Sequence, residues 1–293
     1  HMADIGGRRR APDNKDIYEE GLQIPILKLY EQGQANETLF EIIRQNVRVP
    51  DEVCGDIHAM VGACTRMTEG VSGLLAEYGL PDLMGFGDKI IGLTETAMRR
   101  AISDIPDGVY EATTHIDSFD TTAPLVMQCR IDVRGDELSV DFAGSSPQNR
   151  SPLNSVLGYT SAYSSYALKC VLSPDIPNNE GAFHPITITA PEGSFLNPSY
   201  PAAVEARATV GHYCTSAVFN ALAKALPDRT PAESGVPLHG FAMSGWNGET
   251  PFSTIIFFNG GLGGRPSGDG VSALSFPTNV SNTPTEILER AAP

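Results

Sequence analysis

Residues 125–142 read LVMQCRIDVRGDELSVDF, and this stretch decides the fold class of the chain. Every second residue is apolar, first from Leu125 to Val133 and again from Leu138 to Phe142, which is the side-chain period of a β-strand. Polar, turn-forming residues lie between the two halves. The stretch therefore predicts two antiparallel strands joined by a tight turn.

The same alternation begins further upstream, where Tyr110, Ala112, Thr114 and Ile116 are separated by single residues. This pattern predicts another strand before the pair. We expect the three strands to form an antiparallel meander in the middle of the chain.

The N-terminal third has a helical period instead. Capping-box spacing predicts a short helix over 38–46, and Pro50 ends any continuation. Over 51–78 apolar residues recur at steps of three and four, which is one face of a long amphipathic helix that Gly79 terminates. A second helix is expected over 88–103.

The remaining segments mix both periods. Up to residue 33 we expect loop with a short extended piece over 22–29. In the second half of the chain we expect helices over 155–171 and 204–226 and strands over 186–190 and 252–258. From residue 259 we expect a loop rich in Gly, Ser and Pro, followed by a short helix over 284–290. The predicted fold class is α+β, with a helical N-terminal third, an antiparallel β-meander in the middle and a mixed α/β remainder. Residues 1–105 and 106–293 are expected to form one continuous domain.

The charge, hydropathy and cysteine content of the sequence argue against several classes of function. The formal net charge is −15, and the one basic run, Arg8-Arg9-Arg10, is too short for nucleic-acid binding, which depends on clustered Lys and Arg. No apolar stretch approaches the roughly 20 residues of a membrane span. Five widely spaced cysteines without Cys-x-x-Cys indicate neither a disulfide framework nor a zinc ribbon. We expect a cytoplasmic protein that binds neither nucleic acid nor membrane.

Two short patterns bring imidazole and carboxylate groups together. His1 and Asp4 have a spacing that brings both side chains to one metal ion on a turn. The alternative is a remnant of an expression tag followed by an Asp that caps the next turn. His115 and Asp117 are two apart in a predicted strand and share a face, where a hydrogen-bonded pair at the sheet edge is the alternative.

Turn-rich loops bracket the strand predicted at residue 186. Asn179, His184 and Arg207 are the candidate ligand-binding side chains of this region, against ordinary loop hydrogen bonding. The Gly-rich stretch 260–270 offers backbone N–H groups and an Arg to an anionic substrate, yet it matches no P-loop or dinucleotide fingerprint. No nucleophile elbow and no cysteine in a nucleophile setting is present in the sequence.

Ten landmarks follow one another along the chain in an order that closely resembles the hydantoinase B/oxoprolinase family. They are His1-x-Ala3-Asp4-Ile5-Gly6-Gly7, Glu20-Gly21-Leu22-Gln23-Ile24-Pro25 with Lys28-Leu29, Asn46-Val47-Arg48-Val49-Pro50 with Gly55-Asp56, Asp107-Gly108-Val109-Tyr110, Val140-Asp141-Phe142-Ala143-Gly144-Ser145-Ser146-x-Gln148, Pro177 to Ile186, Ala190-Pro191-Glu192-Gly193-Ser194, Pro201-Ala202-Ala203-Val204 with Arg207, Asp269-Gly270, and Asn282-Thr283-Pro284-x-Glu286.

The resemblance implies a B-type subunit that acts with a hydantoinase A-type partner, the component that uses ATP. Such pairs open hydantoin, 5-oxoproline or lactam rings. Related complexes carboxylate ketones such as acetone or acetophenone, which is the alternative reaction, and a non-catalytic assembly fragment is a further alternative. Family members are longer than this chain, so we expect the central part of a longer subunit in a hetero-oligomer.

The resemblance also implies roles for single residues. His1 and Asp4 correspond to the family's metal-site motif, with zinc, manganese or iron as the ion and further ligands upstream of residue 1. Metal-binding relatives also use an imidazole shortly downstream, and Gln23-Ile24-Pro25-Ile26 contains none. Asp4, His184 and Arg207 are the expected catalytic residues, and ATP is expected on the partner subunit.

Overall fold

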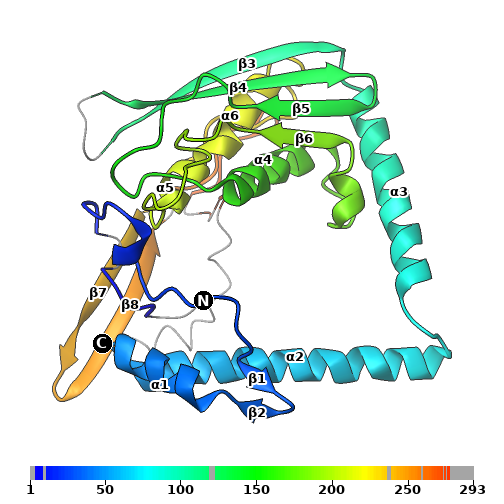
Figure 1. The fold of residues 1–293 in the computed structure, drawn as a ribbon. Coiled ribbons are helices and arrows are strands. Elements are labelled where there is room, and N and C mark those ends of the chain that lie inside the picture. The colour runs from blue at the N-terminus through cyan, green and yellow to red at the C-terminus, as the bar shows by residue number, and fades with distance from the viewer. Residues whose placement is uncertain are drawn as a thin grey trace.

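A computed structural model describes residues 4–8, 11–118, 123–235, 239–258, 260–272, 274 and 276–277. Its elements are η1 (Ile17–Glu19), β1 (Tyr30–Glu31), β2 (Gln34–Ala35), α1 (Glu37–Asn46), α2 (Pro50–Tyr78), α3 (Met84–Ser103), β3 (Gly108–Ile116), β4 (Leu125–Arg134), β5 (Glu137–Asp141), α4 (Leu157–Leu172), η2 (Glu180–Ala182), β6 (Ile186–Thr189), α5 (Arg207–Gly211), α6 (Tyr213–Leu222), β7 (His239–Asn247) and β8 (Thr250–Phe258). The predicted α+β class is confirmed. Figure 1 shows the sheet above α4 and α6, with α3 linking it to the long helix α2.

The main sheet has the strand order β3-β4-β5-β6. Strands β3, β4 and β5 pair antiparallel, which confirms the predicted meander, and β6 joins β5 in parallel. The apolar side chains of β4 that alternate in the sequence are buried, while their neighbours are half-buried or exposed. At the free edge of β3, the Lys224 ammonium donates to the Glu111 carbonyl at 2.5 Å, so a cation covers part of this edge.

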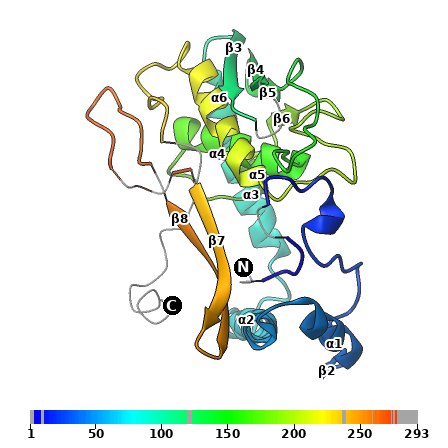
Figure 2. The same cartoon turned by 90° about the vertical axis from the view of Figure 1, so that its left-hand side faces the viewer.

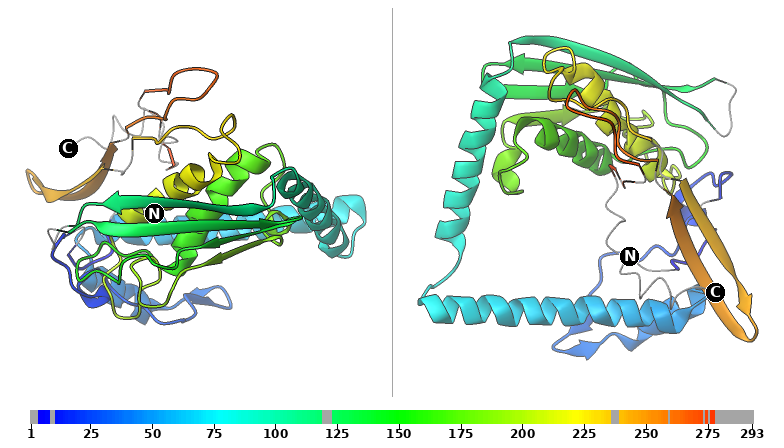
Figure 3. Two further views of the ribbon diagram at one scale, coloured as in Figure 1. Left: turned by 90° about the horizontal axis from the view of Figure 1, so that it is seen from above. Right: turned by 180° about the vertical axis from the view of Figure 1, so that it is seen from behind.

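Helices α4 and α6 cover one face of the sheet, as the view from above shows (Figure 3). Together with the end of α3 they complete the larger hydrophobic core, whose most deeply buried large side chains include Phe142, Phe195, Met98, Met127 and Leu168. A second cluster lies between α1 and the start of α2, around Phe40 and Val53. The helices predicted at 38–46, 51–78 and 88–103 are confirmed to within four residues at each end.

The start of α1 differs from the capping-box prediction. The cap is Asn36, whose side chain accepts from the Leu39 N–H at 3.2 Å, a pattern typical of an N-cap. A short hairpin of β1 and β2, joined by a two-residue turn, precedes α1 and was not predicted. Gln32 and Gly33 both have positive φ there, 50° and 79°, as the tightest hairpin turns require.

The long helix α2 has the predicted apolar stripe, but most of the stripe is not covered by other described residues. Ile57 is buried, whereas Met60, Met67 and Tyr78 are 48%, 67% and 65% exposed. Among the described residues the stripe is therefore buried only at its start, beside α1. The helix leaves the small cluster around α1 and extends along the bottom of Figure 1, where none of the described elements packs on its far half.

The helix predicted from Val204 to Leu226 is wrong in its extent. Helices α5 and α6 cover only the middle of it and are separated at His212. The Glu20 carboxylate binds the backbone N–H of Val204 at 2.8 Å, which holds this residue outside the helix. Beyond α6, the N–H groups of Lys224 and Ala225 donate to carbonyls three residues back, between bonds that span four, so the last turn is irregular.

Strand β8 confirms the strand predicted at 252–258, and its antiparallel partner β7 was not predicted. The hairpin projects beside the rest of the molecule (Figure 2). The signal for it was the two-residue turn Gly248-Glu249, where Gly248 has φ 63°. Residues 260–272 are loop, as predicted, and the helix predicted at 284–290 lies outside the described residues. None of the described helices combines the length and apolarity needed to cross a bilayer.

Candidate functional site

Asp4 lies at the start of the described chain and is fully buried. Its Oδ1 atom accepts from the Gly6 N–H at 3.1 Å and from Arg48 Nη1 at 2.8 Å, and its Oδ2 atom accepts from the backbone N–H of Arg48. Arg48 also donates to the Gly7 carbonyl at 2.6 Å. The first and third family landmarks are thereby joined by a partly buried ion pair.

These contacts bear on the predicted metal site. His1 lies outside the described residues, and within the described ranges no three His, Cys, Asp or Glu side chains could share a metal ion. A guanidinium already neutralises the Asp4 carboxylate. The described residues do not on their own fit a metal ion.

Glu20 connects the second landmark to the loop before α5. Its buried carboxylate accepts from the N–H groups of Val204 and Glu205 at 2.7–3.0 Å. Burial raises the pKa of Glu20, while these hydrogen bonds and the nearby Arg207 charge act in the opposite direction. Asp16 adds an antiparallel bridge to Ala202. The N-terminal segment is therefore fixed against residues 201–205.

The landmark at 140–148 leads into the same region. Gln148 accepts from the Ser199 N–H through its side chain at 2.8 Å and donates its backbone N–H to Gly193. Beyond it, the buried Asn154 side chain accepts from the Asn149 N–H and donates to the carbonyls of Asn149, Ser151 and Ala203 at 2.8–3.0 Å. These bonds fix the loop over 149–154 against the 201–204 landmark.

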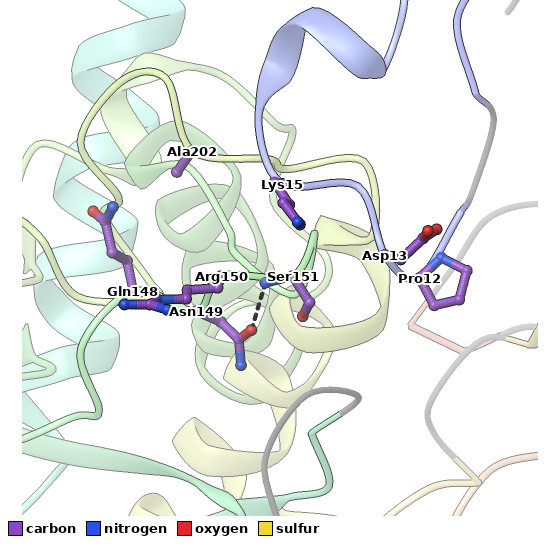
Figure 4. A pocket seen from close by; sticks show the side chains of 8 residues that line it. All are labelled: Pro12, Asp13, Lys15, Gln148, Asn149, Arg150, Ser151 and Ala202. Carbon is purple, nitrogen blue, oxygen red and sulfur yellow. Dashed lines mark hydrogen bonds between the residues drawn. The ribbon is translucent and has the colours of Figure 1, made fainter.

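A cavity of about 740 Å³ lies where the three segments meet. Its walls are Pro12, Asp13 and Lys15 from the N-terminal segment, Gln148, Asn149, Arg150 and Ser151 from the loop after β5, and Ala202. In Figure 4 the Lys15 side chain extends from one wall toward the loop that forms the other. We call this cavity the junction pocket. It contains amide, hydroxyl and cationic groups, which suit a small polar ligand.

Arg207, one predicted catalytic residue, begins α5 behind this junction. Its guanidinium lies 5.7 Å from the ring centre of Tyr159, within cation–π range. The Tyr159 hydroxyl is 3.0 Å from His212 Nε2. Burial lowers the pKa of His212 to about 4, so this imidazole is neutral at physiological pH. The positive charge of Arg207 acts to lower the pKa of the Glu20 carboxyl.

His184, another predicted catalytic residue, lies elsewhere. It follows η2, which packs against α3, whereas α5 is on the opposite side of Figure 1. His184 Nδ1 is 2.9 Å from Glu95 Oε2, and Glu95 also accepts from Arg99 at 2.8 Å. The hydrogen bond to Glu95 raises the pKa of His184. Asn179 donates to Thr94 at 2.8 Å, so the described contacts of this landmark attach it to α3.

The remaining candidates do not meet at the junction pocket. His115 lines a separate cavity of about 440 Å³ with Tyr213 and Glu233. In the Gly-rich loop, Arg265 lines a third cavity, between α4, α6 and the loop. The structure thus pairs Asp4 with Arg48, places Arg207 over Tyr159 at the start of α5, and leaves His184 bound to Glu95 and His115 in a separate cavity.

The family assignment now rests on more than the landmarks. The model of the family described as hydantoinase B/oxoprolinase matches residues 1–293. The chain belongs to this family. It is 32% identical over 310 residues to a protein of Pseudomonas sp. strain NS671 that is described as the B component of a D-/L-hydantoinase, and the match covers 100% of this chain and 52% of that relative.

Solved structures agree with the fold. The ATP-dependent caprolactamase from Pseudomonas jessenii superposes with a TM-score of 0.83 at 28% identity, over 93% of this chain and 49% of that one. Nucleotide-free acetone carboxylase gives a TM-score of 0.78 at 16% identity, over 94% and 40%, and shows the shared fold alone. The chain spans about half the length of these hydantoinase and caprolactamase relatives.

Sequence reasoning missed most of the junction pocket. Lys15, Arg150 and Ser151 flank the landmarks rather than belonging to them, and no spacing rule singles them out. Asn154 lies between Leu153 and Ser155, and no pattern in the surrounding residues marks it as buried. Tyr159 and His212 come together through packing alone.

Proposed function

We propose that the chain acts as the B-type subunit of an ATP-dependent cyclic amidohydrolase and that the junction pocket receives the ring. The observation that carries this proposal is the meeting of separate family landmarks at one polar cavity. Gln148 and Ala202 belong to two landmarks far apart in sequence, and both line this cavity, which is built from loops, where binding residues commonly lie. The chain's relationship to hydantoinase and caprolactamase subunits supports cyclic amides as the substrate class.

A ring amide resists attack by water, so the reaction needs an activated carbonyl. In the proposed sequence, an A-type partner transfers the terminal phosphoryl group of ATP to the amide oxygen. Water then adds to the amide carbon, and the C–N bond breaks as the ring nitrogen takes up a proton and leaves, which gives an acyl phosphate. A second water attacks the acyl phosphate and releases inorganic phosphate and the free carboxylate. The role of the present chain is to hold the ring and exclude bulk water while these steps proceed.

The three predicted catalytic residues, Asp4, His184 and Arg207, have different roles in this proposal. Arg207 begins α5, two residues after the Glu205 N–H that Glu20 binds, and its guanidinium lies over the Tyr159 ring, so we assign it to positioning. Asp4 orders the N-terminal segment through Arg48. His184 is bound to Glu95 far from the pocket, and a direct role for it requires groups beyond the described residues.

The test is reconstitution with an A-type partner. The complex should hydrolyse ATP in step with ring opening of at least one compound among 5-oxoproline, hydantoins and lactams. A complex that assembles but turns over none of them would remove the proposal. Bicarbonate-dependent ATP consumption with acetone or acetophenone would instead establish the carboxylase alternative, for which the acetone carboxylase fold is the relevant observation.

The metal ion predicted at His1 and Asp4 stays a prediction. Metal analysis of the protein beside its Asp4→Ala variant tests it. Loss of zinc, manganese or iron from the variant alone would make Asp4 a ligand, whereas equal metal content would exclude it.

A further inference from the structure

The junction pocket has two cationic side chains and one carboxylate in its wall. Lys15 and Arg150 both line it, and neither forms an ion pair with another residue that the structure describes. The one carboxylate in its wall, Asp13, is bound by both oxygens to Arg8 at 2.7 and 2.9 Å. This hydrogen bonding lowers the pKa of Asp13. Arg8 also pairs with Glu19 at 3.7 Å, and the Glu19 carboxylate accepts from the Lys15 backbone N–H at 3.2 Å. The cations Arg8, Lys15 and Arg150 therefore face the carboxylates of Asp13 and Glu19, which leaves an excess of one positive charge around the pocket.

This local excess contrasts with the rest of the molecule. The chain has 35 acidic and 20 basic residues and a formal charge of −15. In such a protein an anion approaches most of the surface against repulsion. Two cations without an ion-pair partner among the described residues therefore mark this cavity as one place where an anion is favoured.

The wall that carries Arg150 is held in place before any ligand arrives. Asn149 donates to Ser118 and accepts from Ser151, and the fully buried Asn154 fixes the loop backbone. Within the part of the chain that the structure describes, the Ser151 hydroxyl is buried, 3% exposed by residue, and has no hydrogen-bond partner. An unpartnered buried hydroxyl beside two cations is a ready donor to an oxyanion.

We propose that the junction pocket binds a small oxyanion, with Lys15 and Arg150 as its charge partners. The planar guanidinium of Arg150 matches the two oxygens of a carboxylate or phosphate, and the Lys15 ammonium adds a point charge from the facing wall. The oxyanion is either the carboxylate of a ring substrate or a phosphoryl group. A neutral ring leaves both cations unpaired, so charge on the ligand determines binding.

Binding of three probes to the full chain, measured by isothermal titration calorimetry, tests this inference. The probes are 5-oxoproline, 2-pyrrolidinone, which has the same ring without the carboxylate, and inorganic phosphate. At least one oxyanion should bind, and 2-pyrrolidinone should bind more weakly. Since a hydrogen bond to a charged group contributes about 1.5–3 kcal/mol, Lys15→Gln and Arg150→Gln should each weaken oxyanion binding roughly tenfold or more.

The matched controls are Lys89→Gln and Arg100→Gln. Both residues are exposed on α3, away from the pocket, so removing either charge should leave oxyanion binding unchanged. Lys15 and Arg150 are themselves exposed, and circular dichroism should show the same fold in all four variants. Binding should also weaken as sodium chloride concentration rises.

The probes distinguish the two sources of the oxyanion. Preference for 5-oxoproline supports a ring carboxylate, and binding of phosphate alone supports a phosphoryl group. The inference is overturned if no oxyanion binds, if the neutral ring binds as well as the charged one, or if both pocket variants bind like the wild type.

The choice of ring compounds as probes depends on the proposed function, whereas the inference of an oxyanion site depends only on the residues of the junction pocket. Oxyanion binding without ring opening in the reconstituted complex would retain the site and reject the amidohydrolase. Ring opening of neutral lactams with unchanged rates in Lys15→Gln and Arg150→Gln would retain the amidohydrolase and reject the site.

Discussion

Replacing Asn154 by Ala should destabilise the protein more than any exposed polar substitution. The side chain is 0% exposed and takes part in four hydrogen bonds, one to the Asn149 N–H and three to the carbonyls of Asn149, Ser151 and Ala203. The amide nitrogen has two hydrogens, so its three carbonyl contacts count as two donated bonds. With the accepted bond, a net contribution of about 1 kcal/mol for each gives a loss of about 3 kcal/mol in the free energy of unfolding. Urea denaturation followed by circular dichroism measures this loss.

Two companion variants separate hydrogen bonding from side-chain volume. Asn154→Asp keeps the shape and the acceptor for Asn149, yet it directs an oxygen at three carbonyls, so its loss should equal or exceed that of Asn154→Ala. Asn220→Ala, at an exposed position on α6, should change stability by less than about 0.5 kcal/mol. If Asn154→Asp is as stable as the wild type, the hydrogen-bond reasoning is refuted.

Two further predictions concern the attachment of the 177–186 landmark to α3. Glu95 raises the pKa of His184, so the contribution of this histidine to stability is complete below its unfolded pKa of 6.5 and is lost as pH rises through the folded pKa. The Tm of His184→Ala should therefore fall less between pH 6 and pH 8 than the Tm of the wild type. An equal fall in the two proteins would contradict this. A Cβ added at Gly181 would lie 2.1 Å from the Ile91 carbonyl oxygen, whereas one at Gly158 meets no neighbour within 4 Å. Gly181→Ala should therefore lower stability by about 1–3 kcal/mol in urea denaturation while Gly158→Ala is neutral or stabilising, and equal behaviour of the two would reject the close packing of η2 on α3.

The sheet and the main helices were predictable because their patterns are local. The period of two over 125–142 and the period of three to four over 51–78 depend only on which side chains face the same way. The predicted helix boundary was wrong where a residue distant in the sequence binds the backbone. Val204 is held out of its helix by Glu20, a residue far away in sequence, and no local pattern encodes that contact.

The burial of α2 shows a second limit. The apolar steps that continue beyond Ile57 correctly predict a helix, but periodicity does not state what covers the face. Strand β7 shows a third, since its Gly- and Ser-containing sequence lacks the β-branched residues that usually mark a strand. Only the turn at Gly248 indicated the hairpin.

The candidate site was less predictable than the fold. Family landmarks located Asp4 and Arg207, and the sequence alone gave no reason to connect them with Lys15 or Arg150. The junction pocket exists because Glu20, Gln148 and Asn154 bind backbone groups in other segments. Such long-range contacts from side chain to backbone leave no periodic trace in a sequence.

The position of a bound ligand tests the junction pocket most directly. A crystal structure of the protein with 5-oxoproline, or with phosphate if only phosphate binds, should show the oxyanion between Lys15 and Arg150, within hydrogen-bond distance of at least one of them. Ligand density beside His184 or His115, with none between Lys15 and Arg150, would contradict the assignment of the site.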